Sequence, residues 1–69
     1  MKFSARNQLK GKVIEINEGA INSEIVIQIA PGVEVVSIIT KASQAALGLT
    51  VGKEAYALIK ASSVMIATE

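Results

Sequence analysis

The sequence predicts an all-β protein, a five-stranded barrel with one short helix between the third and fourth strands. Apolar and polar residues alternate along most of the chain, which is the periodicity of strands with one buried face. A single alanine-rich segment, residues 41–47, breaks this alternation and favours a helix. The 69 residues show no linker and no repeat, so we expect one domain over residues 1–69.

The first predicted strand contains a change of register. Apolar residues and glycine occupy odd positions in residues 9–13, whereas the apolar residues occupy even positions in residues 14–16. A β-bulge near residues 13–15 would reconcile the two halves, because one extra residue reverses which side chains face the core. The turn expected after this strand is NEGA at residues 17–20, in which Gly19 is the residue most able to adopt a positive φ.

The second and third strands are predicted over residues 21–29 and 33–39, with an Ala-Pro-Gly turn at residues 30–32. The isoleucines of the second strand share odd positions, so one of its faces is expected to be buried. The third strand is apolar on both faces, with Val35 on one and Val36 on the other. Two explanations stay open: the strand is central in a small barrel, or a partner subunit covers its second face.

The helix over residues 41–47 has local signals at both ends. Thr40 is a favoured N-cap, and Gly48 is placed to end the helix at the C-cap. Apolar residues then predict strands over residues 54–60 and 64–67. Three strands, a helix and two further strands are the element order of an OB-type barrel.

The composition predicts self-association. The chain is 51% hydrophobic but only 3% aromatic, and it contains neither Cys nor His. A chain of this size buries only a thin core, and neither disulfides nor the usual zinc ligands are present to compensate. We therefore expect the protein to form a homo-oligomer.

The composition also argues against several classes of function. Without His, Cys or Asp, the chain lacks the usual nucleophile systems and a ligand cluster for a bare metal cation, so we expect no enzyme. A net charge of +1 and two aromatics, Phe3 and Tyr56, argue against nucleic acid binding. No apolar run is long enough for a membrane span and no signal peptide is visible, so we expect a cytoplasmic protein without membrane association.

Hydrogen-bond donors, in contrast, gather at the ends of the predicted strands. Each donor alone has an ordinary structural interpretation, as a helix cap or a surface charge. Together, donors without acceptors favour a small tetrahedral oxyanion that carries no proton. The residues concerned are Ser4, Arg6 and Asn7 before the first strand, Thr40 and Ser43 at the helix N-terminus, and Lys60, Ala61 and Ser62 after the fourth strand.

These segments also resemble a known family. SARNQLKGKV at residues 4–13, SIITKAS at 37–43, LGLTVGKEAYALIKAS at 47–62 and VMI at 64–66 are together similar to the molbindin family, small proteins made of one Mop domain. The resemblance covers nearly the whole chain. It implies an OB-like fold, dimers that exchange their first strand, and homohexamers, built as trimers of these dimers, that bind molybdate or tungstate at subunit interfaces.

The resemblance further implies which residues bind the oxyanion. The family's first motif contacts the anion through a serine and an arginine, which correspond to Ser4 and Arg6, with the backbone around Ala5 and Asn7 nearby. The central and last motifs place the other candidates at Thr40 and Ser43, and at Lys60, Ala61 and Ser62.

The function that the resemblance implies is intracellular binding, storage and buffering of molybdate, which is released unaltered, with no organic cofactor. Two alternatives stay open. One is a regulatory or oligomerisation module that senses molybdate for a partner protein. The other is a carrier of the pterin form of molybdenum cofactor, for which two aromatic residues offer little stacking surface.

Overall fold

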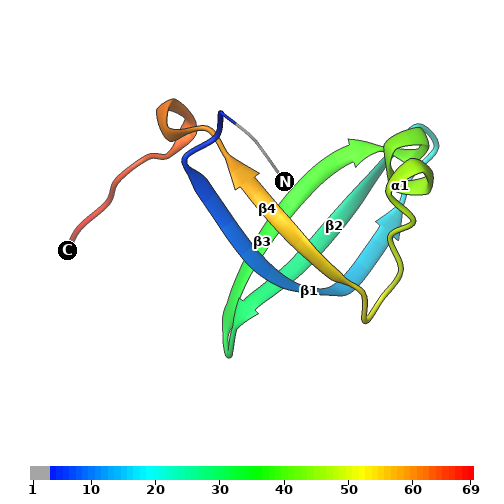
Figure 1. The fold of residues 1–69 in the computed structure, drawn as a ribbon, viewed down its shortest axis with the longest axis horizontal. Coiled ribbons are helices and arrows are strands. Elements are labelled where there is room, and N and C mark those ends of the chain that lie inside the picture. Colours follow the sequence, from blue (N-terminus) through cyan, green and yellow to red (C-terminus); the bar gives the residue numbers. More distant parts are fainter. Residues whose placement is uncertain (1–3) are drawn as a thin grey trace.

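The computed structural model describes residues 4–69, so Phe3, one of the two aromatics, lies outside the described residues. Four strands form one antiparallel sheet in the order β3-β2-β1-β4, with a short helix between the third and fourth strands (Figure 1). The predicted all-β class and the position of the helix are confirmed. The elements are β1 (Asn7–Glu18), β2 (Asn22–Ala30), β3 (Val33–Thr40), α1 (Lys41–Leu47), β4 (Glu54–Ile59) and the 3₁₀ turn η1 (Ala61–Ser63).

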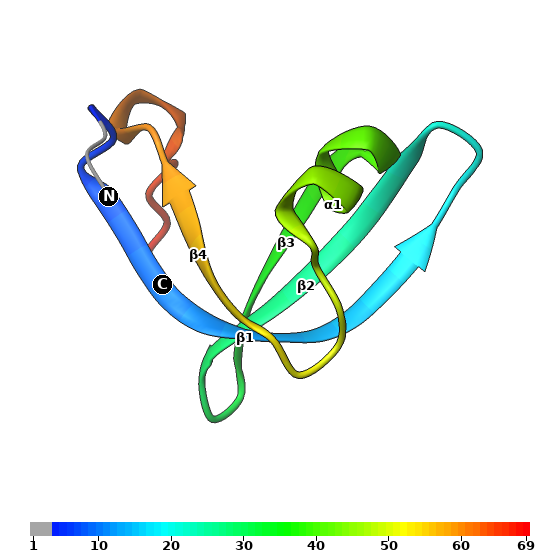
Figure 2. The ribbon, with the colours of Figure 1, turned by 45° about the vertical axis from the view of Figure 1, so that its right-hand side comes forward.

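The long strand β1 joins two arms of a strongly curved sheet. Its first half pairs with β4, from Asn7 opposite Ile59 to Lys12 opposite Glu54, and its second half pairs with β2. Figure 2 shows the result as an open half-barrel, with β1 at the base, β4 in one arm and β2 and β3 in the other. Each half of β1 therefore pairs along one edge with a strand of its own chain.

The bend in β1 coincides with the predicted bulge. The register to β2 shifts between Val13 and Glu15, which confirms the change of parity read from the sequence. The turn before β4 satisfies the backbone of the bulge, because the Val13 N–H donates to the Lys53 carbonyl at 2.9 Å and the Gly52 N–H donates to the Val13 carbonyl at 2.7 Å. The bulge thus also anchors the loop that leads into β4.

Gly11 permits the close approach of β1 to β2. A Cβ atom at this position would lie 2.5 Å from the Gln28 carbonyl oxygen and 2.6 Å from the Ile27 Cγ2. Both distances are shorter than a carbon atom tolerates, and one of the atoms belongs to the backbone. Only glycine fits here without a shift of β2.

Both predicted caps of α1 are confirmed. Thr40 has extended backbone angles (φ −72°, ψ 154°), and its Oγ1 accepts a hydrogen bond from the Ser43 N–H at 3.0 Å. Gly48 adopts the left-handed conformation (φ 62°, ψ 37°) that ends the helix. In addition, the Lys53 ammonium donates to the carbonyls of Leu47 and Gly48 at 3.0 and 3.1 Å, so it satisfies acceptors at the helix C-terminus.

The core is small, as the chain length predicted. Its buried cluster consists of Val13, Ile25, Ile27 and Ala57. The two-sided strand β3 lies at the edge of the sheet, so the explanation that it is central in a barrel is wrong. Its second face stays uncovered in the single chain, with Val36 59% and Ile38 62% exposed.

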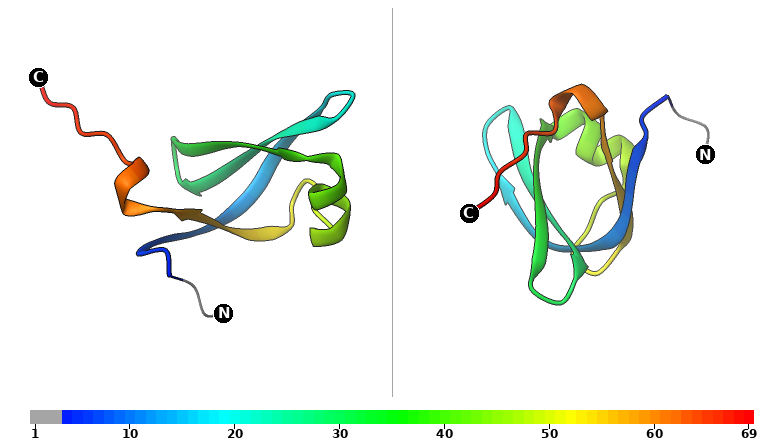
Figure 3. Two further views of the ribbon diagram at one scale, coloured as in Figure 1. Left: turned by 90° about the horizontal axis from the view of Figure 1, so that it is seen from above. Right: turned by 90° about the vertical axis from the view of Figure 1, so that its left-hand side faces the viewer.

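Two expectations differ from the structure. The fifth strand expected over residues 64–67 is not formed in the single chain, because η1 turns this segment away from the sheet and leaves it without a hydrogen-bonded neighbour (Figure 3). The positive φ expected at Gly19 is also wrong, since the described glycines with positive φ are Gly32, Gly48 and Gly52. Gly19 is needed for space instead: a Cβ atom would lie 2.8 Å from the Asn22 carbonyl oxygen.

Candidate functional site

The structure brings the first and last predicted site segments together. Because β1 and β4 are antiparallel, residues 4–7 at the start of β1 lie beside residues 60–62 after the end of β4. The Asn7 Nδ2 group donates a hydrogen bond to the Ile59 carbonyl oxygen at 3.1 Å and closes this end of the pair. We call this group of residues the cation cluster: Ser4, Ala5, Arg6, Asn7, Lys60, Ala61 and Ser62.

The cation cluster carries two positive side chains that are exposed. Within residues 4–69, neither Arg6 nor Lys60 forms an ion pair with a carboxylate, whereas Lys10 pairs with Glu54 at 3.4 Å. Cations without carboxylate partners keep their attraction for an anion from solution. The 3₁₀ turn that begins after Lys60 adds backbone N–H groups at its start.

Thr40 and Ser43 form a second group, which we call the hydroxyl cluster. They are held together by the N-cap of α1: the Thr40 hydroxyl donates to the Ser43 Oγ at 2.9 Å and accepts from the Ser43 N–H at 3.0 Å. The cluster is anchored to the β2 arm because Thr40 pairs with Asn22 and the Lys41 N–H donates to the Ile21 carbonyl at 2.9 Å. Both hydroxyl residues are exposed to solvent.

One chain does not bring the two clusters together. The cation cluster lies at the free end of the arm that contains β4, and the hydroxyl cluster lies at the free end of the arm that contains β3 (Figures 1 and 2). The open interior of the half-barrel separates these ends. A single anion therefore contacts both clusters only if residues from two different chains meet.

A polar network that starts from the buried Ser23 connects α1 to the β1–β2 hairpin. The Ser23 hydroxyl, on a residue that is 1% exposed, donates to the Gln44 Oε1 at 2.5 Å, and the Gln44 Nε2 donates to the Glu18 Oε1 at 3.1 Å. Sequence reasoning missed this network, although a serine at an otherwise apolar position of β2 is the signal that could have shown it.

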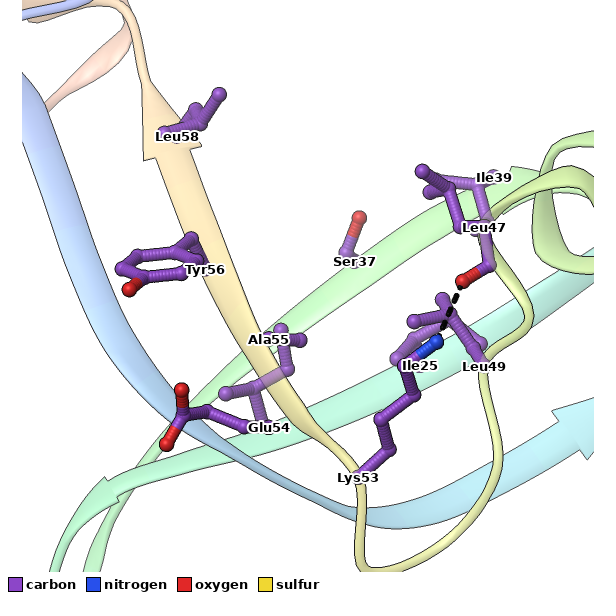
Figure 4. Close-up of a pocket in the computed structure, with 11 residues that line it drawn as sticks. Ile25, Ser37, Ile39, Leu47, Leu49, Lys53, Glu54, Ala55, Tyr56 and Leu58 are labelled. Carbon is purple, nitrogen blue, oxygen red and sulfur yellow. Dashed lines mark hydrogen bonds between the residues drawn. The ribbon is translucent and has the colours of Figure 1, made fainter. Parts of the chain in front are cut away.

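An apolar groove opens between the two arms, and sequence reasoning missed it as well (Figure 4). It has a volume of about 390 Å³ and lies between β3, β4 and the segment that joins α1 to β4. No residue of either cluster lines it. The groove is lined mainly by Ile25, Ile39, Leu47, Leu49, Ala55 and Leu58, with Ser37 on the β3 side.

Other kinds of site find no support within residues 4–69. This part of the chain contains no group of three or more Asp, Glu, His or Cys side chains that could hold a metal ion. None of its helices has the length and apolar character required to cross a membrane.

The TOBE domain model matches residues 4–66, a range that includes both clusters and both arms. The chain belongs to the TOBE domain family. In sequence, this TOBE domain is 52% identical over 69 residues to a probable molybdenum-pterin-binding protein of Haemophilus influenzae, and the match covers all of both chains. Such identity over the full length confirms the resemblance to molbindins, proteins made of one Mop domain.

Solved structures share the fold of this TOBE domain. A molybdate-binding protein from Sporomusa ovata superposes with a TM-score of 0.91 and 38% identity, covering 99% of this chain and 100% of the other. The cytoplasmic molybdate-binding protein ModG, in a form with molybdate bound, gives a TM-score of 0.89 and 45% identity over 94% of this chain and 46% of ModG. The OB-like fold expected from the sequence is thereby confirmed.

Proposed function

We propose that this TOBE domain binds molybdate, with tungstate as a second ligand, and that it stores and buffers the anion in the cytoplasm and releases it unaltered. The observation that carries the proposal is the cation cluster, which joins Arg6 and Lys60 at one end of the β1–β4 pair. Support comes from the relatives, because a protein 38% identical over 99% of this chain and the chain of ModG are molybdate-binding proteins.

The donor set suits a dianionic tetrahedral ligand. The guanidinium of Arg6 and the ammonium of Lys60 supply charge-assisted hydrogen bonds, and the hydroxyls of Ser4 and Ser62 supply neutral ones. The backbone N–H groups of Ala5, Asn7 and Ala61 are the remaining candidate donors. Selectivity against sulfate is geometric in this proposal: the donors reach all four oxygens only when the larger molybdate tetrahedron fills the site.

The complete site is shared between chains in this proposal. The cation cluster of one chain meets Thr40 and Ser43 of another, because the two clusters lie on separate arms of the single chain. Dimers that assemble into homohexamers supply such interfaces, and the uncovered faces of β3 and of the groove supply the apolar surface that association buries. Binding of the anion and self-association of the chain are therefore coupled in this proposal.

Isothermal titration calorimetry of the anion-free protein with molybdate tests the proposal. Sulfate and phosphate serve as controls, and the number of anions bound per chain is recorded. Of these three anions, we expect only molybdate to bind tightly. The number of molybdate ions bound per chain should then report sites that are shared at subunit interfaces. The absence of heat with molybdate, from protein verified by sedimentation to be assembled, would contradict the proposal.

The name of the Haemophilus influenzae relative favours a second candidate, a carrier of a molybdenum-pterin compound. Its ligand would need a flat apolar surface, and the groove beside Tyr56 is the place that offers one. Purification from cells rich in molybdenum cofactor, followed by measurement of pterin fluorescence, separates the two candidates. Retained pterin would favour the carrier, whereas its absence together with molybdate binding would support the free oxyanion.

A further inference from the structure

The helix α1 is held on the sheet without a buried apolar face. It contains no buried residue, and Gln44 is the only one of its residues that is half-buried, because all the others are exposed. Leu47, its largest apolar residue, is 60% exposed. A helix of about two turns is not stable by itself in water. The position of α1 on the sheet therefore depends on polar contacts.

Gln44 makes the polar contacts of the first part of α1. Its Oε1 accepts a hydrogen bond from the buried Ser23 hydroxyl on β2 at 2.5 Å, and its Nε2 donates to the Glu18 Oε1 at the end of β1 at 3.1 Å. Both the acceptor and the donor of one amide group are thus used, and each bonds to a different strand. This arrangement allows one orientation of the Gln44 side chain.

A separate contact holds the other end of α1. The Lys53 ammonium donates to the carbonyls of Leu47 and Gly48 at 3.0 and 3.1 Å (Figure 4). The backbone of Lys53 is itself anchored to the bulge in β1, since its carbonyl accepts from the Val13 N–H at 2.9 Å. Replacement of Gln44 should therefore free the first turn of α1 while its C-terminus stays attached.

The orientation of Ser43 depends on that first turn. Consecutive helical residues point about 100° apart around the axis, so Gln44 directed at the sheet leaves Ser43 at the exposed surface. Thr40 is the last residue of β3 and is fixed by pairing with Asn22, whereas Ser43 belongs to α1. The rotation of α1 therefore sets where the Ser43 hydroxyl lies relative to the Thr40 hydroxyl.

We propose that Gln44 is a positioning residue for anion binding. It fixes the rotation of α1 between Ser23 and Glu18, and in this way keeps the hydroxyl cluster in the geometry that receives the anion. Gln44 itself does not touch the anion. A cluster that is already ordered binds more tightly, because no ordering cost is paid on binding. This inference rests on the proposed function and adds to it a residue outside both clusters.

A double-mutant cycle measured by calorimetry with molybdate tests whether Gln44 acts through Ser43. Gln44→Met keeps the length of the side chain and removes both hydrogen bonds. We expect it to raise the dissociation constant at least about fivefold in the natural chain, and less than about twofold in a chain that carries Ser43→Ala. Equal losses in the two chains would overturn the inference, because general loosening of the fold acts equally in both.

Two variants of Glu18 test the same contact without leaving the buried Ser23 hydroxyl unpaired. Glu18→Gln keeps an acceptor for the Gln44 amide, whereas Glu18→Ala does not. Both remove the same charge and the ion pair with Lys41 at 3.9 Å. We expect Glu18→Gln to bind molybdate at least about threefold more tightly than Glu18→Ala. Equal affinities would overturn the inference.

Amide exchange with solvent, measured by NMR without any anion, tests the positioning directly. The Ser43 N–H donates to the Thr40 Oγ1 at 3.0 Å, so its exchange reports the first turn of α1. The matched control is Asn17→Ala, which removes an amide that bridges two carboxylates of the same hairpin and has no bond to α1. We expect the Ser43 amide to exchange at least about fivefold faster in Gln44→Met than in Asn17→Ala.

The two proposals fail in distinguishable ways. If the natural chain does not bind molybdate, the proposed function is wrong, and the Ser43 amide exchange alone decides whether Gln44 positions the hydroxyl cluster. If the natural chain binds molybdate but the Ser43 amide exchanges equally in Gln44→Met and Asn17→Ala, the positioning role alone is overturned.

Discussion

The side-chain Nδ2 of Asn7 donates a hydrogen bond to the carbonyl oxygen of Ile59 at 3.1 Å and ties the start of β1 to the end of β4. Fifty-two positions of sequence separate the two residues. This contact fixes the chain one residue after Arg6 and one residue before Lys60. The two cations of the cation cluster are therefore placed at one end of the sheet by antiparallel pairing.

Substitution of either cation should weaken molybdate binding. Arg6→Ala or Lys60→Ala removes one charge-assisted hydrogen bond, worth about 1.5 to 3 kcal/mol, so we expect the dissociation constant to rise about tenfold to a hundredfold. Calorimetry measures the change. Lys10→Ala is the matched control, since it removes a lysine paired with Glu54 outside both clusters. If both variants bound molybdate with the affinity of the natural chain, Arg6 and Lys60 would be excluded from the site.

The double variant adds a sharper test of the cation cluster. If Arg6 and Lys60 contact the same anion, Arg6→Ala/Lys60→Ala should lose less affinity than the sum of the two single losses. Strict additivity in the double-mutant cycle would indicate that the two side chains act at separate sites.

Thr40 is expected to have two separable roles. Its side chain caps α1, and removal of an N-cap costs about 1 kcal/mol, so Thr40→Ala should lower both the free energy of unfolding and the affinity for molybdate. Thr40→Asp keeps a good cap but places a carboxylate beside the anion, so it should retain stability and lose affinity. Thr40→Ser should retain both. Urea unfolding at fixed protein concentration and calorimetry measure the two properties.

A purely structural Thr40 would give a different pattern. In that case affinity would follow stability across the three variants, and Thr40→Asp would bind molybdate as well as Thr40→Ser does. That result would remove the hydroxyl cluster from the proposed site and leave the cation cluster to bind the anion.

Gly11 should be the least replaceable glycine of the sheet. In Gly11→Ala the new Cβ would lie 2.5 Å from a backbone oxygen of β2, so we expect a loss of at least the 1 to 3 kcal/mol roughly typical of overpacking. Gly52→Ala is the comparison, because its surroundings are open and only its positive φ is strained. We expect a smaller loss there, about 1 to 2 kcal/mol. A larger loss in Gly52→Ala, measured by urea unfolding, would show that β1 does not need the close approach to β2 at Gly11.

Local features of the fold were predictable because their causes are local. The ends of α1 follow from the side chain of Thr40 and the backbone freedom of Gly48, and both act within one turn of the helix. The bulge near Val13 follows from the change of apolar parity, which any buried strand must resolve. The element between residues 64 and 67 was different: its apolar pattern indicates a strand, but a strand exists only where a neighbour accepts its hydrogen bonds.

The candidate site was predictable as a set of residues but not as an arrangement. The sequence indicated donors before β1, at the start of α1 and after β4, and the resemblance grouped them into one site. Neither the sequence nor the resemblance indicated that Arg6 and Lys60 lie on one arm of the sheet while Thr40 and Ser43 lie on the other. That division depends on the curvature of β1, which contains the bulge and the close approach to β2 at Gly11.

The sequence by itself determined which side chains are available: it contains no His, Cys or Asp, and it places hydrogen-bond donors at the ends of strands. It also determined the helix and its caps, because short-range hydrogen bonds and backbone preferences act between residues close in the chain. Only the tertiary structure decided that two donor clusters lie apart and that an apolar groove stays open between β3 and β4. These features depend on the pairing of residues distant in sequence, and the apolar surface left over exceeds what one short chain can bury.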